Sequence, residues 1–349
     1  MRNIKRLIST LLFVLMAVLS VVAVFKFSSG VSLGDVAESL KDANKPWIAG
    51  SIAAVAMYII AESSAIGLLL RSSGYRSRAH KCLSYSAASI YFSAITPSSS
   101  GGQPASAYLM IKDKLPAGVV SATLAINVAM YTLATEVVGI TAILIAPGLF
   151  ESFSPFSRIL ILVGFGTYTA LTVLFIVLIK KGKVVFVTLE KLLRFLHSKK
   201  IIRRLEPKLF KLTKARAEYE EAVHVSAGKP LAMIMAFAWN LVQRVSQIAV
   251  SVCVYMALGG KAGLMPKMFS AQSLISIGYN SVPIPGAMGV ADYLMIDGFS
   301  TIVSGRQAVK LELLSRGISF YLCVLICGLI VFGGFLTGTV RAHRSKSAE

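Results

Sequence analysis

The chain has 349 residues, of which 55% are hydrophobic and 15% are charged. Soluble domains carry about a quarter of charged residues, so this composition excludes an ordinary soluble fold and predicts an all-α protein that crosses a membrane several times. A net charge of +20 would suggest nucleic-acid binding in a soluble chain. Here Lys and Arg gather at the ends of apolar runs, where they set orientation and meet anionic lipid, so no nucleic-acid partner is expected.

Cysteine and histidine give no sign of a disulfide framework, a metal site or a catalytic centre. The four Cys have no CxxC spacing, and the four His lie in or beside basic polar segments. The Gly101-Gly102 pair is not followed by Lys-Ser/Thr, so it is not a nucleotide loop. No catalytic residue, metal or cofactor is expected.

Six apolar runs have about the length that a bilayer core demands. They are residues 7–25, 47–70, 117–146, 158–179, 231–258 and 311–340. The first would also suit a cleaved signal peptide, but Lys26 closes it and no A-x-A-like site follows, so we keep it as a span. Lys and Arg beside the runs place both termini in the cytoplasm and the protein in the cell membrane.

A basic segment separates two membrane halves, which we predict at residues 1–179 and 231–349. Between positions 180 and 229 there are fourteen Lys and Arg against five Glu, which predicts a cytoplasmic location. Its apolar residues recur at helical spacing, at Phe186, Leu189, Leu192, Leu193 and Leu196. That pattern is typical of a helix on the inner leaflet, and a solvated helical linker fits equally well. The 180–230 linker is therefore cytoplasmic or interfacial.

Two further segments, 83–111 and 268–299, are apolar at both ends and helix-breaking in the middle. The breaks at 95–104 and 280–289 are each followed by Tyr-Leu-Met-Ile, at a constant offset of 185 positions. We therefore predict two re-entrant hairpins that enter the membrane from opposite sides, as an inverted repeat. Secondary transporters of this design bind substrate where their discontinuous helices meet.

The start of a helix after each break is a candidate anion site. Pro104 is expected in the first turn of one helix, and residues 287–290 open the other. Free N–H groups and the positive end of the helix dipole would attract a lipid phosphate. The neighbouring glycines would allow close backbone approach, with tight helix packing as the alternative explanation.

Ionisable residues inside spans are costly, so each is a functional candidate. They are Glu62, Glu136, Arg244, Asp292, Asp297, Glu312 and Arg316. Arg244, near Gln243 and Gln247, is the better candidate for holding phosphate. The two aspartates would complement a cationic headgroup, and Glu312 and Arg316, four apart, would equally suit a structural ion pair. Asn127, Asn240 and Asn280 are expected to tie helices together.

These motifs resemble a known family. The first, T-P-x-x-x-G-G-x-x-x-x-x-Y-L, is carried by Thr96-Pro97, Gly101-Gly102 and Tyr108-Leu109, and the second, P-x-P-G-x-x-G-V, by residues 283–290. With an arginine at position 316, the chain from about residue 4 to 340 resembles the flippase-like transmembrane domain of lysylphosphatidylglycerol synthases, the multiple peptide resistance factors. The resemblance implies movement of a charged phospholipid, such as aminoacyl-phosphatidylglycerol, between leaflets.

The predicted substrate-binding residues combine both lines of reasoning. They are Thr96, Pro97, Gly101, Gly102, Gln103, Tyr108, Arg244, Pro285, Gly286, Gly289, Asp292 and Arg316. The family often has Glu or Arg soon after the double glycine, whereas Gln103, Pro104 and Ala105 follow here, which leaves the headgroup open.

Two other classes of function stay open. The chain would alternatively be a membrane subunit that presents lipid to a separate synthase, as in phosphatidylglycerol lysyltransfer. Lysyltransferase activity of its own is not expected, because those synthases carry a soluble catalytic domain after the membrane part and this sequence ends nine residues beyond position 340. A scaffold without transport is the third class. The lipid, direction, coupling ion and formation of a homo-oligomer are left open.

Overall fold

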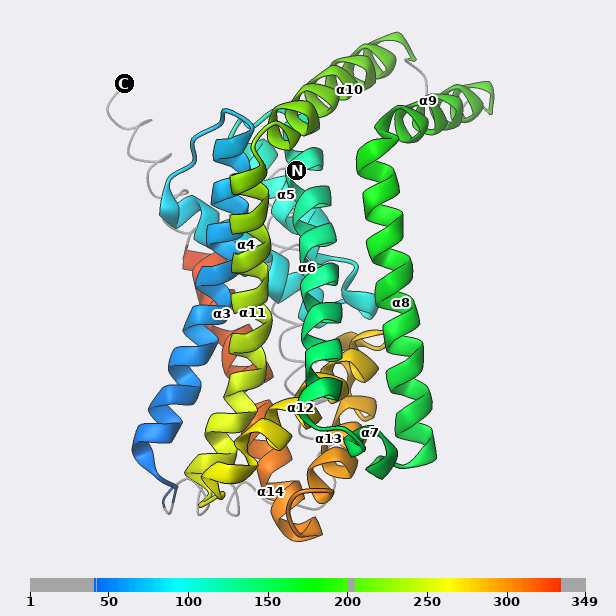
Figure 1. Ribbon diagram of the computed structural model, residues 1–349. Coiled ribbons are helices and arrows are strands. Elements are labelled where there is room, and N and C mark those ends of the chain that lie inside the picture. The colour runs from blue at the N-terminus through cyan, green and yellow to red at the C-terminus, as the bar shows by residue number, and fades with distance from the viewer. Residues whose placement is uncertain (1–40, 42, 200–204, 334–349) are drawn as a thin grey trace, which may run out of the picture.

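The computed structural model describes residue 41 and residues 43–199 and 205–333 (Figure 1). All regular structure in these residues is helical, with no strand among them, which confirms the predicted all-α class. The predicted first span, 7–25, and the end of the last, 334–340, lie outside the described residues. The count of six spans therefore stays a prediction.

Four described helices are long and apolar enough to cross a membrane: α3 (Lys45–Ser72), α6 (Ala117–Ile145), α8 (Pro155–Lys180) and the continuous helix Gly305–Gly333. The last comprises α14 (Gly305–Arg316), the π-helical turn η4 (Gly317–Leu322) and the helical residues after it. Helix α11 (Pro230–Ala257) meets the same test only together with α10 (Glu206–Ala227), from which it is bent by 92°. The protein is thus a multi-pass membrane protein with four or five candidate spans in the described residues.

Proline marks where several of these helices begin. It stands in the first turn of α3, α8, α10, α11 and α12. A first-turn N–H has no partner within the helix, so proline costs no hydrogen bond there and presets φ. Helices α3 and α11 lie side by side and antiparallel (Figure 1), and the Asn44 N–H donates to the Ala257 carbonyl oxygen at 2.9 Å.

Each segment expected to break holds two helices around a non-helical stretch. The first comprises α4 (Ala79–Ile95), η1 (Pro97–Ser99) and α5 (Gly102–Lys112), and the second α12 (Met265–Asn280), η3 (Pro285–Ala287) and α13 (Val290–Ser300). Thr96 is extended, with φ −112° and ψ 146°, because a residue before proline avoids the helical region. The two segments approach from opposite ends of the bundle, and η1 contacts η3 in the middle (Figure 1).

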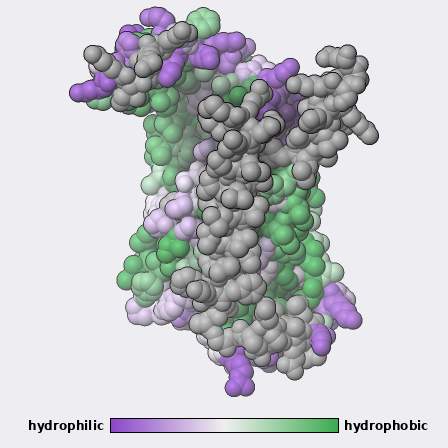
Figure 2. Space-filling view, turned by 180° about the vertical axis from the view of Figure 1, so that it is seen from behind, coloured by the Kyte–Doolittle hydropathy of each residue, from purple (hydrophilic) through white to green (hydrophobic). Residues whose placement is uncertain are grey.

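The remaining elements lie at the two ends. Helices α9 (Gly182–Ser198) and α10 cover one end, while α7 (Leu149–Ser152) and η2 (Ala262–Leu264) lie at the other (Figure 1). Hydrophilic side chains gather at both ends and apolar ones around the middle (Figure 2). This distribution matches a protein that is surrounded by lipid between two aqueous faces.

Helices α4 and α5 of the first broken segment approach each other so closely that only glycine fits at position 102. A Cβ built on Gly102 would overlap the Ser93 hydroxyl and the Ser89 carbonyl oxygen of α4. Since the carbonyl belongs to the backbone, α4 and α5 would have to move apart to admit a methyl group.

Gly102→Ala should therefore destabilise the protein by about 1–3 kcal/mol, the usual cost of overpacking. The melting temperature of the purified chain in detergent measures this. The matched control is Gly166→Ala on α8, where a Cβ would meet nothing within 4 Å. Equal melting temperatures for the two variants would contradict the close approach.

Candidate functional site

A cavity of about 300 Å³ lies where the two broken segments meet. Helices α3, α6, α8, α11 and α14 close it from the sides, and residues of α4, η1, α12 and η3 reach it from the breaks. Its polar lining includes Glu62, Ser93, Gln103, Asn127, Tyr131, Gln243, Arg244, Gln272, Asn280 and Arg316. A polar cavity thus lies inside an apolar bundle, between residues that are far apart in sequence.

Arg244 is the buried cation of this cavity. Only 3% of the residue is exposed, and its Nε has no hydrogen-bond partner. The guanidinium carbon lies 4.2 Å from the ring centroid of Tyr131 and 5.8 Å from that of Tyr58. Among the described residues no carboxylate oxygen lies within 4.0 Å of it. A buried charge normally has an ionic partner, so this guanidinium is arranged to receive an anion.

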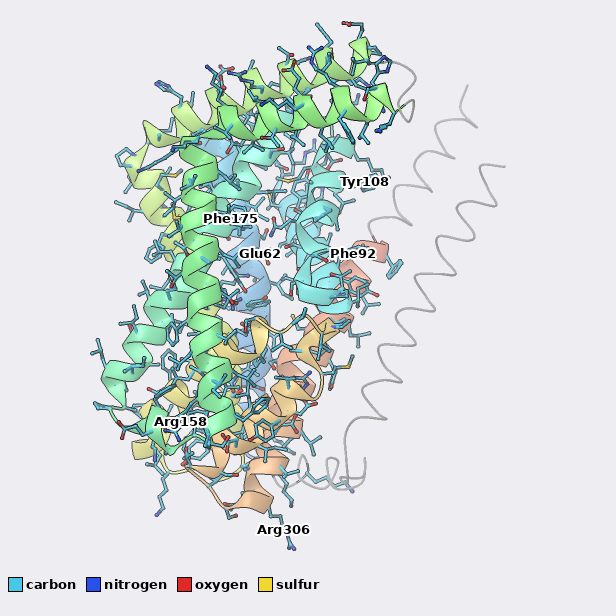
Figure 3. The ribbon with its side chains drawn as sticks, turned by 90° about the vertical axis from the view of Figure 1, so that its right-hand side faces the viewer. Glu62, Phe92, Tyr108, Arg158, Phe175 and Arg306 are labelled. Atoms are coloured by element: carbon cyan, nitrogen blue, oxygen red, sulfur yellow. The ribbon has the colours of Figure 1, made fainter. Side chains whose placement is uncertain are left out.

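The neighbouring Glu62 is held by an amide instead of by that arginine. Gln243 Nε2 donates to Glu62 Oε2 at 3.1 Å, joining α11 to α3, while Gln243 Oε1 has no partner. Glu62 lies at mid-height inside the bundle (Figure 3). The cavity thus presents a bonded carboxylate and an unbonded guanidinium on adjacent helices.

Arg316 has partners on two sides. Its Nε forms an ion pair with Asp292 Oδ1 at 2.8 Å without making a hydrogen bond to it, and its Nη2 donates to the Gly286 carbonyl oxygen at 2.8 Å. Asp292 Oδ2 also accepts from the Gly289 N–H at 2.8 Å, at the start of α13. The ion pair between Glu312 and Arg316, one of the two alternatives left open by their spacing, is not formed, because Arg316 pairs with Asp292 at the second break.

Of the predicted site residues, four line the cavity: Gln103, Arg244, Gly286 and Arg316. Thr96 uses its hydroxyl within the first break, accepting from the Gly101 N–H at 2.8 Å and donating to the Phe92 carbonyl oxygen at 2.6 Å. The remaining glycines and prolines, Pro97, Gly101, Gly102, Pro285 and Gly289, shape the breaks outside the lining. Tyr108 is 62% exposed at the outer edge of α5 (Figure 3).

Two asparagines tie helices as expected, and the third does not. Asn240 Nδ2 donates to Asn127 Oδ1 at 3.1 Å, joining α11 to α6. Asn280 instead lines the cavity with its Nδ2 unpartnered. The side-chain oxygens of Gln103 and Gln272 also lack a hydrogen-bond partner. The cavity therefore holds several unused hydrogen-bonding atoms.

The aromatic surroundings of Arg244 were not predicted. Tyr58, Tyr131, Tyr168 and Tyr279 all line the cavity, from α3, α6, α8 and α12. Their only signal in the sequence is that each is a polar aromatic residue in an apolar run. Four positions so far apart can be grouped only once helix packing is known.

A family model described as the lysylphosphatidylglycerol synthase TM region matches residues 10–327, which is most of the chain. No curated protein and no solved structure matches this chain.

The Arg316–Asp292 pair gives a prediction about stability. Arg316→Gln and Asp292→Asn should each lower stability by about 2–4 kcal/mol, because each leaves its partner largely buried and unpaired. The double variant should lose less than the sum of the two, since the interaction can be lost only once. Thermal unfolding in detergent measures the three values.

The control uses the other acid near Arg316. Coupling between Arg316→Gln and Glu312→Gln should be smaller than coupling to Asp292→Asn, because the ion pair is made with Asp292. The reverse order would restore the i,i+4 pair as the partner of Arg316.

Proposed function

This chain belongs to the family of lysylphosphatidylglycerol synthase transmembrane regions, and from that premise we propose that it moves a charged phospholipid between the leaflets of the cell membrane. The observation that carries the proposal is the buried, unpaired guanidinium of Arg244 in a polar cavity between two broken segments. Such a group is costly in a bilayer, and intramembrane charges mark substrate pathways.

The proposed architecture is an inverted repeat, with α4–α5 and α12–α13 as re-entrant hairpins from opposite sides. Irregular backbone at membrane depth is tolerated only in protein or beside a wet cavity, and both breaks border this one. The shared Tyr-Leu-Met-Ile sequence after each break supports the same conclusion. In such transporters the substrate binds near the midplane, where the discontinuous helices meet.

The end that carries α9 and α10 is proposed to be cytoplasmic. It holds the described parts of the Lys- and Arg-rich segment, residues 180–199 and 205–229, while Arg158 and Arg306 lie at the opposite end (Figure 3). The positive-inside rule then orients the bundle. With this orientation α4–α5 enters from the cytoplasm and α12–α13 from outside.

The cavity is proposed to bind the headgroup alone. A volume of about 300 Å³ is at the small end of ligand pockets, so acyl chains would remain in the surrounding lipid. Arg244 would pair with the phosphate through a charge-assisted hydrogen bond. The unpartnered amide atoms of Gln103, Gln272 and Asn280 would bond the rest of the headgroup, as buried polar atoms require.

Arg316 is proposed to support this site rather than bind lipid. Its guanidinium is already ion-paired with Asp292 and donates to the Gly286 carbonyl oxygen. A phosphate at Arg316 would compete with that ion pair, whereas Arg244 has no carboxylate within 4.0 Å among the described residues, and the nearby Glu62 accepts from Gln243 instead. Asp292 is engaged for the same reason and is less suited to a cationic headgroup than to holding the second break.

The second candidate is a membrane subunit that presents lipid to a separate synthase. The observation that favours it is the description of the family itself, which names the membrane region of a synthase. The same cavity would serve both functions, so transport by the pure chain distinguishes them.

Arg244→Gln should reduce lipid translocation by about tenfold or more, the effect of losing a charged hydrogen bond of 1.5–3 kcal/mol. The assay uses the pure chain in vesicles with nitrobenzoxadiazole-labelled phosphatidylglycerol, its aminoacyl form and phosphatidylcholine. It measures the fraction of label reduced by dithionite, which does not cross the membrane and therefore reaches the outer leaflet alone. Arg244→Lys, which keeps the charge but not the planar donors, should retain part of the rate.

The control is Arg306→Gln, which removes an exposed arginine at the far end of the bundle. It should translocate at the wild-type rate, and all variants should elute as monodisperse protein. If the wild-type chain moves no lipid faster than empty vesicles do, transport is excluded and the subunit function is favoured.

A further inference from the structure

Helix α9 carries an apolar surface that faces away from the rest of the described protein. Val184, Leu189, Leu192 and Phe195 are 60%, 41%, 49% and 57% exposed. At 3.6 residues per turn these four positions fall within an arc of about 140°. We call it the apolar arc of α9. Exposed large apolar residues gathered on one helix face mark an interaction surface.

A different face of α9 packs on the protein. Phe186 lies against Tyr219 of α10, with ring centroids 5.4 Å apart. Leu193 lies about two turns after Phe186, on the same side of the helix, and is only partly exposed. Contact with α10 therefore uses this face and leaves the apolar arc unpartnered.

The position of α9 is fixed by the span before it. Helix α8 ends at Lys180 and α9 begins at Gly182, so α9 starts at the depth at which α8 leaves the membrane. It turns sideways from the end of α8 (Figure 1) and runs alongside α10 (Figure 3). A helix held at this level lies at the boundary between headgroups and acyl chains.

The positive charge of α9 and the residues beside it favours anionic lipid. Residues 180–199 contain six Lys and Arg and one Glu, and that Glu190 is paired with Arg194 at 2.8 Å. At about 100° per residue Lys191 borders the apolar arc, and Arg194 lies on the polar side of the helix, almost opposite Leu192. Basic residues beside a membrane surface are each attracted by about 1 kcal/mol to anionic lipid.

We propose that α9 is a docking surface for the anionic phospholipids of the cytoplasmic leaflet. The apolar arc inserts among the upper acyl chains, and the Lys and Arg side chains extend along them to the phosphates. This site is separate from the central cavity and does not depend on lipid translocation.

Tryptophan quenching by brominated lipid tests the proposal on the full chain in vesicles. Trp47 and Trp239 are the two tryptophans of the sequence and are replaced by Phe in all variants. Leu192→Trp then reports from the apolar arc, and Arg194→Trp, almost opposite on the helix and similarly exposed, is the matched control. The vesicles contain phosphatidylcholine and phosphatidylglycerol, with bromine on the acyl chains of one or the other at equal mole fraction.

The Leu192→Trp fluorescence should be quenched at least about twice as strongly as that of Arg194→Trp, as for a helix half immersed in the interface. Quenching should be stronger when bromine is on phosphatidylglycerol. Lys183→Gln with Lys191→Gln should remove that preference, whereas Lys208→Gln with Lys211→Gln on α10 should not. Unchanged thermal unfolding in detergent establishes that each variant is folded.

Three results would overturn the proposal. Equal, weak quenching at both positions would place the arc in water. Blue-shifted emission of Leu192→Trp without quenching would place a second copy of the chain against it. Equal quenching by the two brominated lipids would leave a membrane-surface helix with no choice of lipid charge.

Discussion

A chain that breaks its helices inside an apolar bundle must satisfy the backbone groups freed there, because apolar surroundings offer no partner for them. The two breaks do so by different means. In the first, the Thr96 hydroxyl bonds both the Gly101 N–H and the Phe92 carbonyl oxygen. In the second, the Asp292 carboxylate bonds the Gly289 N–H while its partner Arg316 donates to the Gly286 carbonyl oxygen. One break is closed by a neutral side chain of its own segment, the other by an ion pair between segments.

This difference separates the two buried arginines of the cavity, Arg244 and Arg316. Both are buried in the central cavity, and either could hold a phosphate by composition alone. Arg316 has a carboxylate at 2.8 Å, so its charge is compensated within the protein. Arg244 has aromatic rings in place of a carboxylate, and a ring face attracts a cation without neutralising it. The neighbouring acid, not the arginine itself, decides which one remains available to an anion.

Much of the fold could be predicted, since apolar runs of bilayer length and proline-glycine breaks are local signals. The spans expected at 47–70 and 158–179 begin and end within three residues of α3 and α8. The residues of the candidate site were harder to predict. The repeated Tyr-Leu-Met-Ile correctly drew attention to the breaks, yet Tyr108 faces outward and Tyr293 bonds the Ser154 hydroxyl at 2.9 Å, so neither lines the cavity. The i,i+4 spacing suggested Glu312 as the ion-pair partner of Arg316. Partners on other helices depend on how the helices pack, and local sequence patterns do not show this.

The same asymmetry indicates which break is easier to move. Among the described residues, the hydrogen bonds of positions 96–102 stay within the first segment, including those from Thr96 and Ser100. It lies beside η3, and within the described residues no hydrogen bond joins the two. The second break is instead bonded to α14 through Arg316. Drawing η1 away from η3 would therefore break no hydrogen bond between the two within the described residues. Moving η3 together with α13 away from α14 would instead break the Arg316–Gly286 hydrogen bond and the largely buried Arg316–Asp292 ion pair, at a cost of several kcal/mol. If access to the cavity alternates, η1 can therefore move at a lower cost in free energy than η3 and α13, because α4 is bonded to α3 through Ser86, which lies before the break, whereas Arg316 holds η3 and α13 directly.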